Sequence, residues 1–367
     1  MKQKTFDEVF VDETKYGTKI KTDEYFAEGK NIIVDQGQKL VAGYTDLEDG
    51  IFSKVPAIIF GDHTRVIKYI DKPFFLGADG VKVLRSKLDE VNYKYLYYAL
   101  RNVKIPDTGY NRHFKWLKEI CIRYPEMKAQ EKIVNILDKV NSVIEDRKRE
   151  LEKLDDLIKA RFVEMFGDPD TNLRGWDEVA LSEKLNVIGG YAFKSDQFDE
   201  ESGIPVLRIG NINAGFFRPV NLVYWQKDEN LERYVMYPGD LVMSLTGTVG
   251  KDDYGNVCIL GDDYEMYYLN QRNAKLEIKE GIDKHYLSQL LKFEQIKKKL
   301  TGISRGVRQA NISNKDILNL VVPVPPMDLQ NQYADFIKQT DKSKAAVQKA
   351  LDEAQLLFDS LMQKYFG

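Results

Sequence analysis

The sequence predicts an α+β fold in which two globular mixed α/β modules alternate with two long helices, packed as an antiparallel coiled coil with pseudo-two-fold symmetry. The first observation is a repeat: the segment from Pro125 to Gly167 recurs 200 residues later, from Pro325 to Gly367, without a gap. The second is the spacing of apolar residues in both copies, which alternates between four and three. That spacing is typical of a coiled-coil seam.

Two of the seam positions in the first copy are polar, because Arg147 and Arg161 occupy them. These arginines either set the register of the coiled coil or extend to solvent, and we favour solvent. Forty helical residues would span roughly 60 Å. The alternative interpretation is two unrelated surface helices. The predicted helix–helix seam comprises Ile133, Leu137, Val140, Ile144, Leu151, Leu154, Ile158, Ile337, Val347, Leu351, Phe358 and Leu361.

The chain therefore divides into four predicted domains, in the order module, helix, module, helix. They cover residues 1–124, 125–167, 168–324 and 325–367. The modules are predicted to be rich in short strands between Gly and Asp turns. The predicted strands are 31–34, 56–60, 64–69, 120–124, 206–209, 240–244, 257–260, 274–278 and 318–322, with helices at 93–100 and 283–300 and a turn at 311–315.

The two modules also resemble each other. Phe74-Phe75-Leu76 before 81–84 has a counterpart in Tyr267-Tyr268-Leu269 before 274–276. The chain thus reads as a duplicated half, and a duplication with packed helices is expected to fold with the approximate two-fold symmetry of a homodimer.

Composition excludes several classes of protein. Two distant cysteines and three histidines provide neither a disulfide framework nor a zinc-binding pattern, so a reducing cytoplasm is expected. The N-terminal residues lead into no apolar run, so no signal peptide is expected, and no apolar stretch is long enough to span a membrane. A net charge of −3 counts mildly against a non-specific nucleic-acid binder, but leaves room for a local basic face.

The sequence contains no convincing catalytic motif. Residues 246–251 resemble a phosphate-binding loop, but Leu245 stands where the first glycine belongs and Asp252 stands where Ser or Thr is needed. No Asn-Pro-Pro-aromatic string of an amino-methyltransferase and no Ser-His-Asp arrangement are present. We therefore expect a chain that is not an enzyme and that needs no cofactor and no metal.

A basic stretch near the end of the second module favours DNA contact. It feeds the glycine-flanked segment 305–309, in which Arg305, Arg308 and Gln309 carry side chains that pair bidentately with guanine and adenine edges. The alternative is that the basic residues form only a solvated helix face. Against a single acidic residue, Glu294, the stretch has six basic residues: Lys292, Lys297, Lys298, Lys299, Arg305 and Arg308.

Further candidate DNA contacts lie in both modules. Thr246 could equally serve plain turn chemistry, and the lysines are expected mostly to hold phosphates. The first module contributes Arg65, Arg112, His113 and Lys115, and the second contributes Lys194, Thr246, Thr248, Lys251 and Arg272.

The strings that identify a family are concentrated in the second module. Residues 190–195 (Gly-Tyr-Ala-Phe-Lys-Ser), 203–212, 238–250 and 309–313 resemble the target-recognition domain of the specificity subunits of Type I restriction-modification systems. The Val-Pro-Pro junction followed by Gln330 resembles the start of that family's helical region. The first module departs from the pattern, because it has only Ile58-Ile59-Phe60-Gly61-Asp62 where the second has Gly-Asp-Leu-Val-Met-Ser.

This resemblance implies a function. Each globular domain would read one half of a bipartite site on double-stranded DNA. The helices would set the spacing and bind two methyltransferase (modification) subunits, and restriction subunits would join through that complex. A protein-interaction scaffold without DNA readout, or an enzyme with an unrecognised site, are the competing hypotheses.

Overall fold

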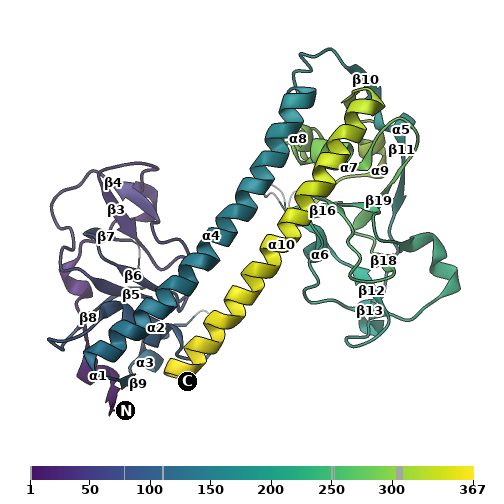
Figure 1. The fold of residues 1–367 in the computed structure, drawn as a ribbon. Coiled ribbons are helices and arrows are strands. Elements are labelled where there is room, and N and C mark those ends of the chain that lie inside the picture. The colour runs from purple at the N-terminus through teal and green to yellow at the C-terminus, as the bar shows by residue number, and fades with distance from the viewer. Residues whose placement is uncertain (1, 78, 110, 249–250, 252, 303–308) are drawn as a thin grey trace. The chain divides into compact units, whose positions relative to one another are not determined.

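The computed structural model describes residues 2–77, 79–109, 111–248, 251, 253–302 and 309–367 (Figure 1). It consists of two compact units. The first contains Met1–Arg149 and Val347–Gly367, and the second contains Glu150–Ala346. Each unit therefore combines one globular module with one half of each long helix. The long helices are α4 (Met127–Phe166) and α10 (Met327–Phe366), of 40 residues each.

The described residues of the first module form three small sheets and three α-helices, besides two short 3₁₀ helices, Thr14–Tyr16 and Thr22–Glu24. Its elements are β1 (Lys2–Thr5), α1 (Phe6–Val9), β2 (Phe10–Asp12), β3 (Asn31–Val34), β4 (Gly43–Thr45), β5 (Ala57–Gly61), β6 (Ile67–Ile70), β7 (Phe74–Leu76), β8 (Val81–Ser86), α2 (Tyr93–Arg101), α3 (Phe114–Leu117) and β9 (Cys121–Tyr124). The largest sheet has the order β2-β8-β5-β6, with β5 buried along its whole length. A second sheet has the order β4-β3-β7, and β1 pairs with β9.

The module of the second unit has more elements. They are β10 (Asp177–Ala180), α5 (Leu181–Lys184), β11 (Leu185–Gly189), β12 (Ile204–Leu207), α6 (Ile209–Ile212), β13 (Tyr224–Trp225), β14 (Val235–Met236), β15 (Leu241–Ser244), β16 (Thr246–Thr248), β17 (Val257–Ile259), β18 (Tyr267–Leu269), β19 (Asn273–Ile278), α7 (Lys284–Lys292), α8 (Glu294–Thr301), β20 (Gln309–Asn311), α9 (Asn314–Leu318) and β21 (Val321–Val324).

The sheets of the second module repeat those of the first. The order β11-β19-β15-β17 corresponds to β2-β8-β5-β6, and the pair β10-β21 corresponds to β1-β9. The parallel pairing of β12 with β18 corresponds to that of β3 with β7. The duplication predicted from the sequence is therefore present in the topology. The second module adds α6, α8, β14 and a two-stranded ribbon of β16 and β20 to this common plan.

The long helices pack on each other within each unit, the early part of one against the late part of the other. In the first unit Leu137 and Ile144 of α4 share a hydrophobic core with Phe358 of α10. In the second unit Ile158 of α4 shares a core with Ile337 of α10. This is the antiparallel seam that the heptad pattern predicts. Of the predicted seam residues, Ile133, Leu137, Ile144, Ile158, Ile337, Val347 and Phe358 are buried and Val140, Leu151, Leu154, Leu351 and Leu361 are half-buried.

Within each unit, a second stripe of side chains on the long helices packs onto the globular module. In the second unit the buried ring of Phe162 stacks on Tyr286 of α7 at 5.2 Å, and Phe166 meets the same tyrosine at 4.9 Å. In the first unit Phe366 lies 5.2 Å from Tyr95 of α2. The heptad seam alone did not predict this stripe. Arg161, which was expected to extend to solvent, is half-buried: it pairs with Glu164 at 2.7 Å, and its guanidinium carbon lies 6.0 Å from the centroid of the Phe336 ring of α10.

Four of the predicted elements differ from those observed. The strand predicted at 64–69 begins at Ile67, because residues 62–66 form the turn after β5. The predicted helix 283–300 is broken at Phe293, whose extended backbone (φ −67°, ψ 131°) separates α7 from α8. The strand predicted at 206–209 ends at Leu207, because Arg208 caps α6. The strand predicted at 318–322 begins at Val321, because residues 314–318 form α9.

Candidate nucleic-acid interface

Both modules build the same loop-bearing edge with the same two backbone hydrogen bonds. In the first module the residue after β5, Asp62, donates its N–H to the Gly80 carbonyl (2.7 Å) and accepts from the His113 N–H (2.8 Å). In the second module the residue after β15, Leu245, donates to the Arg272 carbonyl (2.8 Å) and accepts from Ile312 (2.8 Å). We call this the shared edge: residues 62–65 with the segment from Asp107 to Lys115 in one module, and residues 245–248 with Lys251, Arg272 and 309–312 in the other.

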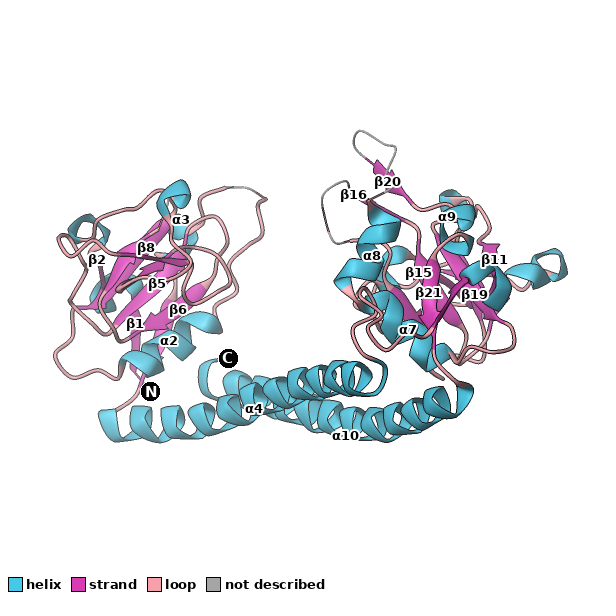
Figure 2. Cartoon of the chain, turned by 90° about the horizontal axis from the view of Figure 1, so that it is seen from above, coloured by secondary structure: helices cyan, strands magenta, loops and turns pink. Residues whose placement is uncertain are grey.

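The shared edge collects most of the predicted contact residues that the structure describes. Figure 2 shows β16 and β20 of the second unit, and α3 of the first, at the end of each module that lies away from the long helices. A surface of loops and short elements held by a sheet is the common setting for binding residues.

In the first module the turn between β5 and β6 is short and presents Arg65. Its backbone has a left-handed φ of 61°, which is uncommon for a residue other than glycine. The guanidinium pairs with the Asp107 carboxylate at 2.7 Å. The Gly109 backbone N–H, followed by Arg65, holds the pKa of Asp107 below its usual range. The turn and the segment leading to His113 are thus joined by a charged contact.

His113 is a buried anchor of the shared edge and is not an exposed contact residue. Its side chain is fully buried, with Nδ1 3.0 Å from the Asp62 carbonyl and Nε2 3.4 Å from the Thr108 hydroxyl. The Asp62 carboxylate accepts from the Phe114 N–H at the start of α3 (2.7 Å). A buried ring cannot meet a base edge in this conformation, so the expectation that His113 contacts DNA is wrong.

Arg112 and Lys115 flank this anchor and are exposed. The Lys115 ammonium lies 4.9 Å from the centroid of the Trp116 ring, which limits its range of positions. Both side chains can therefore reach a partner at the shared edge.

In the second module the shared edge is extended by the β16–β20 ribbon. Thr246 pairs with Asn311 and Thr248 with Gln309. The Asp253 carboxylate accepts from the Thr248 N–H (2.8 Å), and this hydrogen bond is the main cause that lowers the pKa of Asp253. The Thr246 hydroxyl is buried without a hydrogen-bond partner among the described residues, whereas Thr248 is exposed. Thr248 is therefore the better placed of the two threonines to contact a ligand.

The remaining predicted residues of the second module fall into three groups. Lys251 and Arg272 are exposed, and Arg272 lies in the turn between β18 and β19 that supports Leu245. Lys194 is exposed too, but it lies in the segment that follows β11 and is not part of the ribbon. For Gln309 only the backbone pairing is described. Arg305 and Arg308 lie outside the described residues.

Sequence reasoning missed the carboxylates that order this edge. Asp62 and Asp253 hold backbone N–H groups of the loops, and neither was a candidate. An aspartate just after a predicted strand, as at Asp62, is a signal for such turn chemistry. The structure also argues against a phosphate-binding loop at 246–251. Thr246–Thr248 form a strand of the ribbon, whereas a phosphate-binding loop leads from a strand into a helix.

Among the described residues no group of three or more His, Cys, Asp or Glu side chains could hold a metal ion. Within the same residues no helix is long and apolar enough to cross a membrane.

The comparisons with known proteins agree with one another. A family model described as the Type I restriction modification DNA specificity domain matches residues 2–155 and 174–355. The specificity subunit of the Type I restriction enzyme MjaVIII of Methanocaldococcus jannaschii is 27% identical over 317 residues, 75% of this chain and 72% of that protein. The EcoBI specificity subunit of Escherichia coli is 26% identical over 182 residues, which are 47% of this chain and 35% of the EcoBI subunit.

A solved structure shows the same fold. The crystal structure of the S subunit from M. genitalium superposes with a TM-score of 0.58 at 19% identity, covering 100% of this chain and 96% of that one. The family model extends over most of the chain and includes both modules. The duplicated modules, the two 40-residue helices and these matches lead to one conclusion: the chain belongs to the family of Type I restriction-modification DNA specificity subunits.

Proposed function

We propose that the chain reads a bipartite site on double-stranded DNA, with one half-site contacted by the shared edge of each module, and that it performs no chemistry itself. The observation that carries this proposal is the repetition of one edge with different side chains. The same two backbone hydrogen bonds support it in both modules. The first module presents Arg65 and Arg112, whereas the second presents Thr248 and Arg272. A common frame with different polar groups suits two different half-sites.

The charge at these edges supports a DNA ligand. Arginine pairs bidentately with guanine, and exposed lysines such as Lys115 and Lys251 suit phosphates. The whole chain carries a net charge of −3, so binding of DNA would depend on local cations such as these.

The proposal includes two methyltransferase subunits bound along the long helices, with restriction subunits joining through them. The support is a pair of exposed leucines at equivalent positions of the repeat. Leu157 in the second unit is 48% exposed and Leu357 in the first is 51% exposed. Exposed apolar residues at equivalent positions of two repeated helices, with further exposed apolar residues at Val143, Val163 and Leu356, suit repeated contacts with two copies of one partner.

The experiment is a selection of random duplexes by the chain co-expressed with its methyltransferase, followed by sequencing. The wild type should enrich two short conserved blocks separated by unconserved bases. Replacing Arg112 with Ala should relax the preference in one block only, and replacing Arg272 with Ala should relax it in the other. Each change should cost roughly 1–3 kcal/mol of binding free energy if the side chain reads a base.

The two variants serve as controls for each other, because each removes one exposed cation from one module. If both weaken binding to every sequence equally, these arginines contact only phosphates. If the wild-type complex enriches no sequence at all, DNA readout is wrong and the chain is a protein-interaction scaffold.

A further inference from the structure

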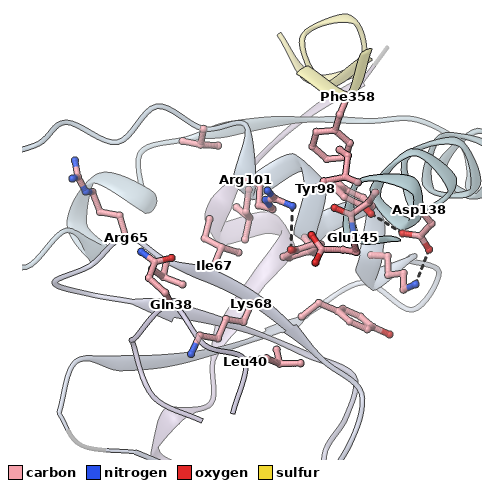
Figure 3. Close-up of a pocket in the computed structure, with 18 of the residues that line it drawn as sticks. Gln38, Leu40, Arg65, Ile67, Lys68, Tyr98, Arg101, Asp138, Glu145 and Phe358 are labelled. Atoms are coloured by element: carbon pink, nitrogen blue, oxygen red, sulfur yellow. Dashed lines mark hydrogen bonds and ion pairs between the residues drawn. The ribbon is translucent and has the colours of Figure 1, made fainter. Parts of the chain in front are cut away.

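A groove of about 940 Å³ lies within the first unit, between its module and the long helices. Arg65 belongs both to this groove and to the shared edge. The other residues that line the groove lie outside the shared edge. From Arg65 the groove follows β6 to α2 and then to α4 and α10 (Figure 3). The charged residues that line it are Arg65, Lys68, Lys94, Arg101, Lys104, Asp138, Glu145 and Lys148.

Four of its six cations already have carboxylate partners. Arg65 pairs with Asp107 (2.7 Å) and Lys94 with Asp138 (2.6 Å). The other two pairs are Lys148 with Glu145 (3.0 Å) and the buried Lys68 with Asp35 (3.4 Å).

The remaining two cations, Arg101 and Lys104, have no carboxylate partner among the described residues. Arg101 is held in place by rings: its guanidinium carbon lies 5.5 Å from the Tyr97 ring centroid and 5.6 Å from that of Phe358. It also donates to the Tyr97 hydroxyl at 3.3 Å. Figure 3 shows Arg101 amid the drawn residues, with Phe358 on one side and Ile67 on the other. Both cations are exposed, so an anionic ligand can reach them.

The equivalent groove of the second unit provides an internal contrast. It has a volume of about 640 Å³ and lies between α7, β17 and the same two long helices, with Lys292 at the position of Arg101. The residues that line it include equal numbers of lysines and carboxylates, so their formal charges cancel: Lys159, Lys292, Lys297 and Lys344, and Asp155, Asp156, Glu294 and Asp341. The excess of positive charge therefore belongs to the groove of the first unit and is not a by-product of the shared architecture.

We propose that Arg101 and Lys104 bind the DNA backbone at phosphates next to the half-site that the first module reads. This rests on the proposed function. A duplex carries one negative charge per roughly 1.7 Å of its axis, so a duplex lying on Arg65 has further phosphates within reach of a row of cations that continues from it. Such contacts position the DNA and read no bases. An acidic protein segment is the other ligand that this charge would accept, and the experiment separates the two.

The experiment measures the affinity of the complex with its methyltransferase for the selected duplex and for an unrelated duplex, as a function of salt. The variant is Arg101→Gln with Lys104→Gln. The control, Lys128→Gln with Lys132→Gln, removes the same charge from exposed positions of α4 that do not line the groove. Loss of two phosphate contacts should make the slope of log affinity against log salt less negative by about 1.8, which corresponds to roughly 30-fold weaker binding near 0.15 M salt.

Both duplexes should lose affinity by the same factor, with base preferences unchanged and the control unaffected. Lys104→Gln alone should give about half of the slope change, and since this side chain is exposed, the variant keeps the experiment valid if loss of the Arg101 ring contacts harms folding. An unchanged slope overturns the assignment. So does a loss confined to methyltransferase affinity, which would indicate a protein ligand. A wild-type complex with no sequence preference would instead overturn the proposed function.

Discussion

At the scale of single residues, one glutamine is used in the same way twice. Gln130 and Gln330 are buried near the start of the long helices. Each donates its side-chain N–H to the carbonyl of the proline five residues earlier, at 2.9 and 2.7 Å. Each also accepts from the backbone N–H of the residue that caps the module helix: Asn92 at 3.1 Å and Asp283 at 2.7 Å. This side chain therefore locks each long helix to its module.

Replacing Gln330 with Leu should destabilise the second unit by about 1–3 kcal/mol, because a buried N–H and a buried carbonyl lose their partner. Urea unfolding followed by circular dichroism measures the change. The control is Gln348→Leu, since Gln348 is exposed and its side chain donates to Asp352 one turn away on the same helix. Equal unfolding midpoints for the two variants would contradict the locking role.

The repeat exposed these glutamines in the sequence, but it could not assign their partners. Those partners lie 38 and 47 residues away along the chain. His113 shows the opposite failure. A histidine among Arg112 and Lys115 reads as part of a basic contact segment, and only the packing against Asp62 reveals that it is buried. Sequence spacing indicates which residues share a segment, whereas burial is decided by residues distant in sequence.

At the scale of elements, the spacing of apolar residues predicted helix bounds well where one spacing continued over many turns. It predicted them poorly where a contact with a residue distant in sequence interrupted the helix. Both 40-residue helices begin and end within two residues of their predicted bounds. The helix predicted at 283–300 is interrupted because Phe293 turns its ring to within 5.0 Å of Phe162 on α4. The start of α9 could have been predicted from the sequence, because Ser313 and Asp316 form a capping box. The run of apolar residues that follows was instead interpreted as a strand at 318–322.

The two exposed leucines of the helices provide a matched pair of variants. Leu157→Glu and Leu357→Glu place a charge on equivalent surfaces of the second and first unit. If each surface binds one methyltransferase, either variant should leave one methyltransferase per chain, and the double variant should leave none. Native mass spectrometry of the co-expressed proteins measures this stoichiometry. A single variant that releases both copies, or a wild-type complex with one copy, would contradict two equivalent docking surfaces.

At the scale of the whole molecule, the compact units cut across the order of the chain. The second unit is one continuous segment, Glu150–Ala346, whereas the first joins the two ends of the chain. Both follow one plan of module plus two helix halves, with matching sheet orders. The repeat in the sequence was enough to predict this plan. It could not predict the β16–β20 ribbon or the charge excess of one groove, because these are features in which the two copies differ.

The continuity of α4 and α10 across both units leads to the last prediction, that the helices determine the spacing of the two half-sites. One heptad added to a single helix shifts half of its seam against an unchanged partner. It should therefore disrupt packing in the cores that contain Leu137 and Phe358 or Ile158 and Ile337. One heptad added to both, after Glu150 and after Val347, preserves the seam. It lengthens the pair by roughly 10 Å, at about 1.5 Å per residue.

On duplex DNA, at about 3.4 Å per base pair, the double insertion corresponds to roughly three more pairs between the half-sites. Three pairs also turn one half-site by more than a quarter of a helical turn, at about 10.5 pairs per turn, so some affinity should be lost. Methylation mapping of a genome by the variant complex measures the outcome. Both half-sites should persist with a longer spacer, or methylation should cease because the rotation is not tolerated, and the single insertion should lower stability. Full activity at the original spacing would show that the modules are flexibly tethered and that the helices do not act as a ruler.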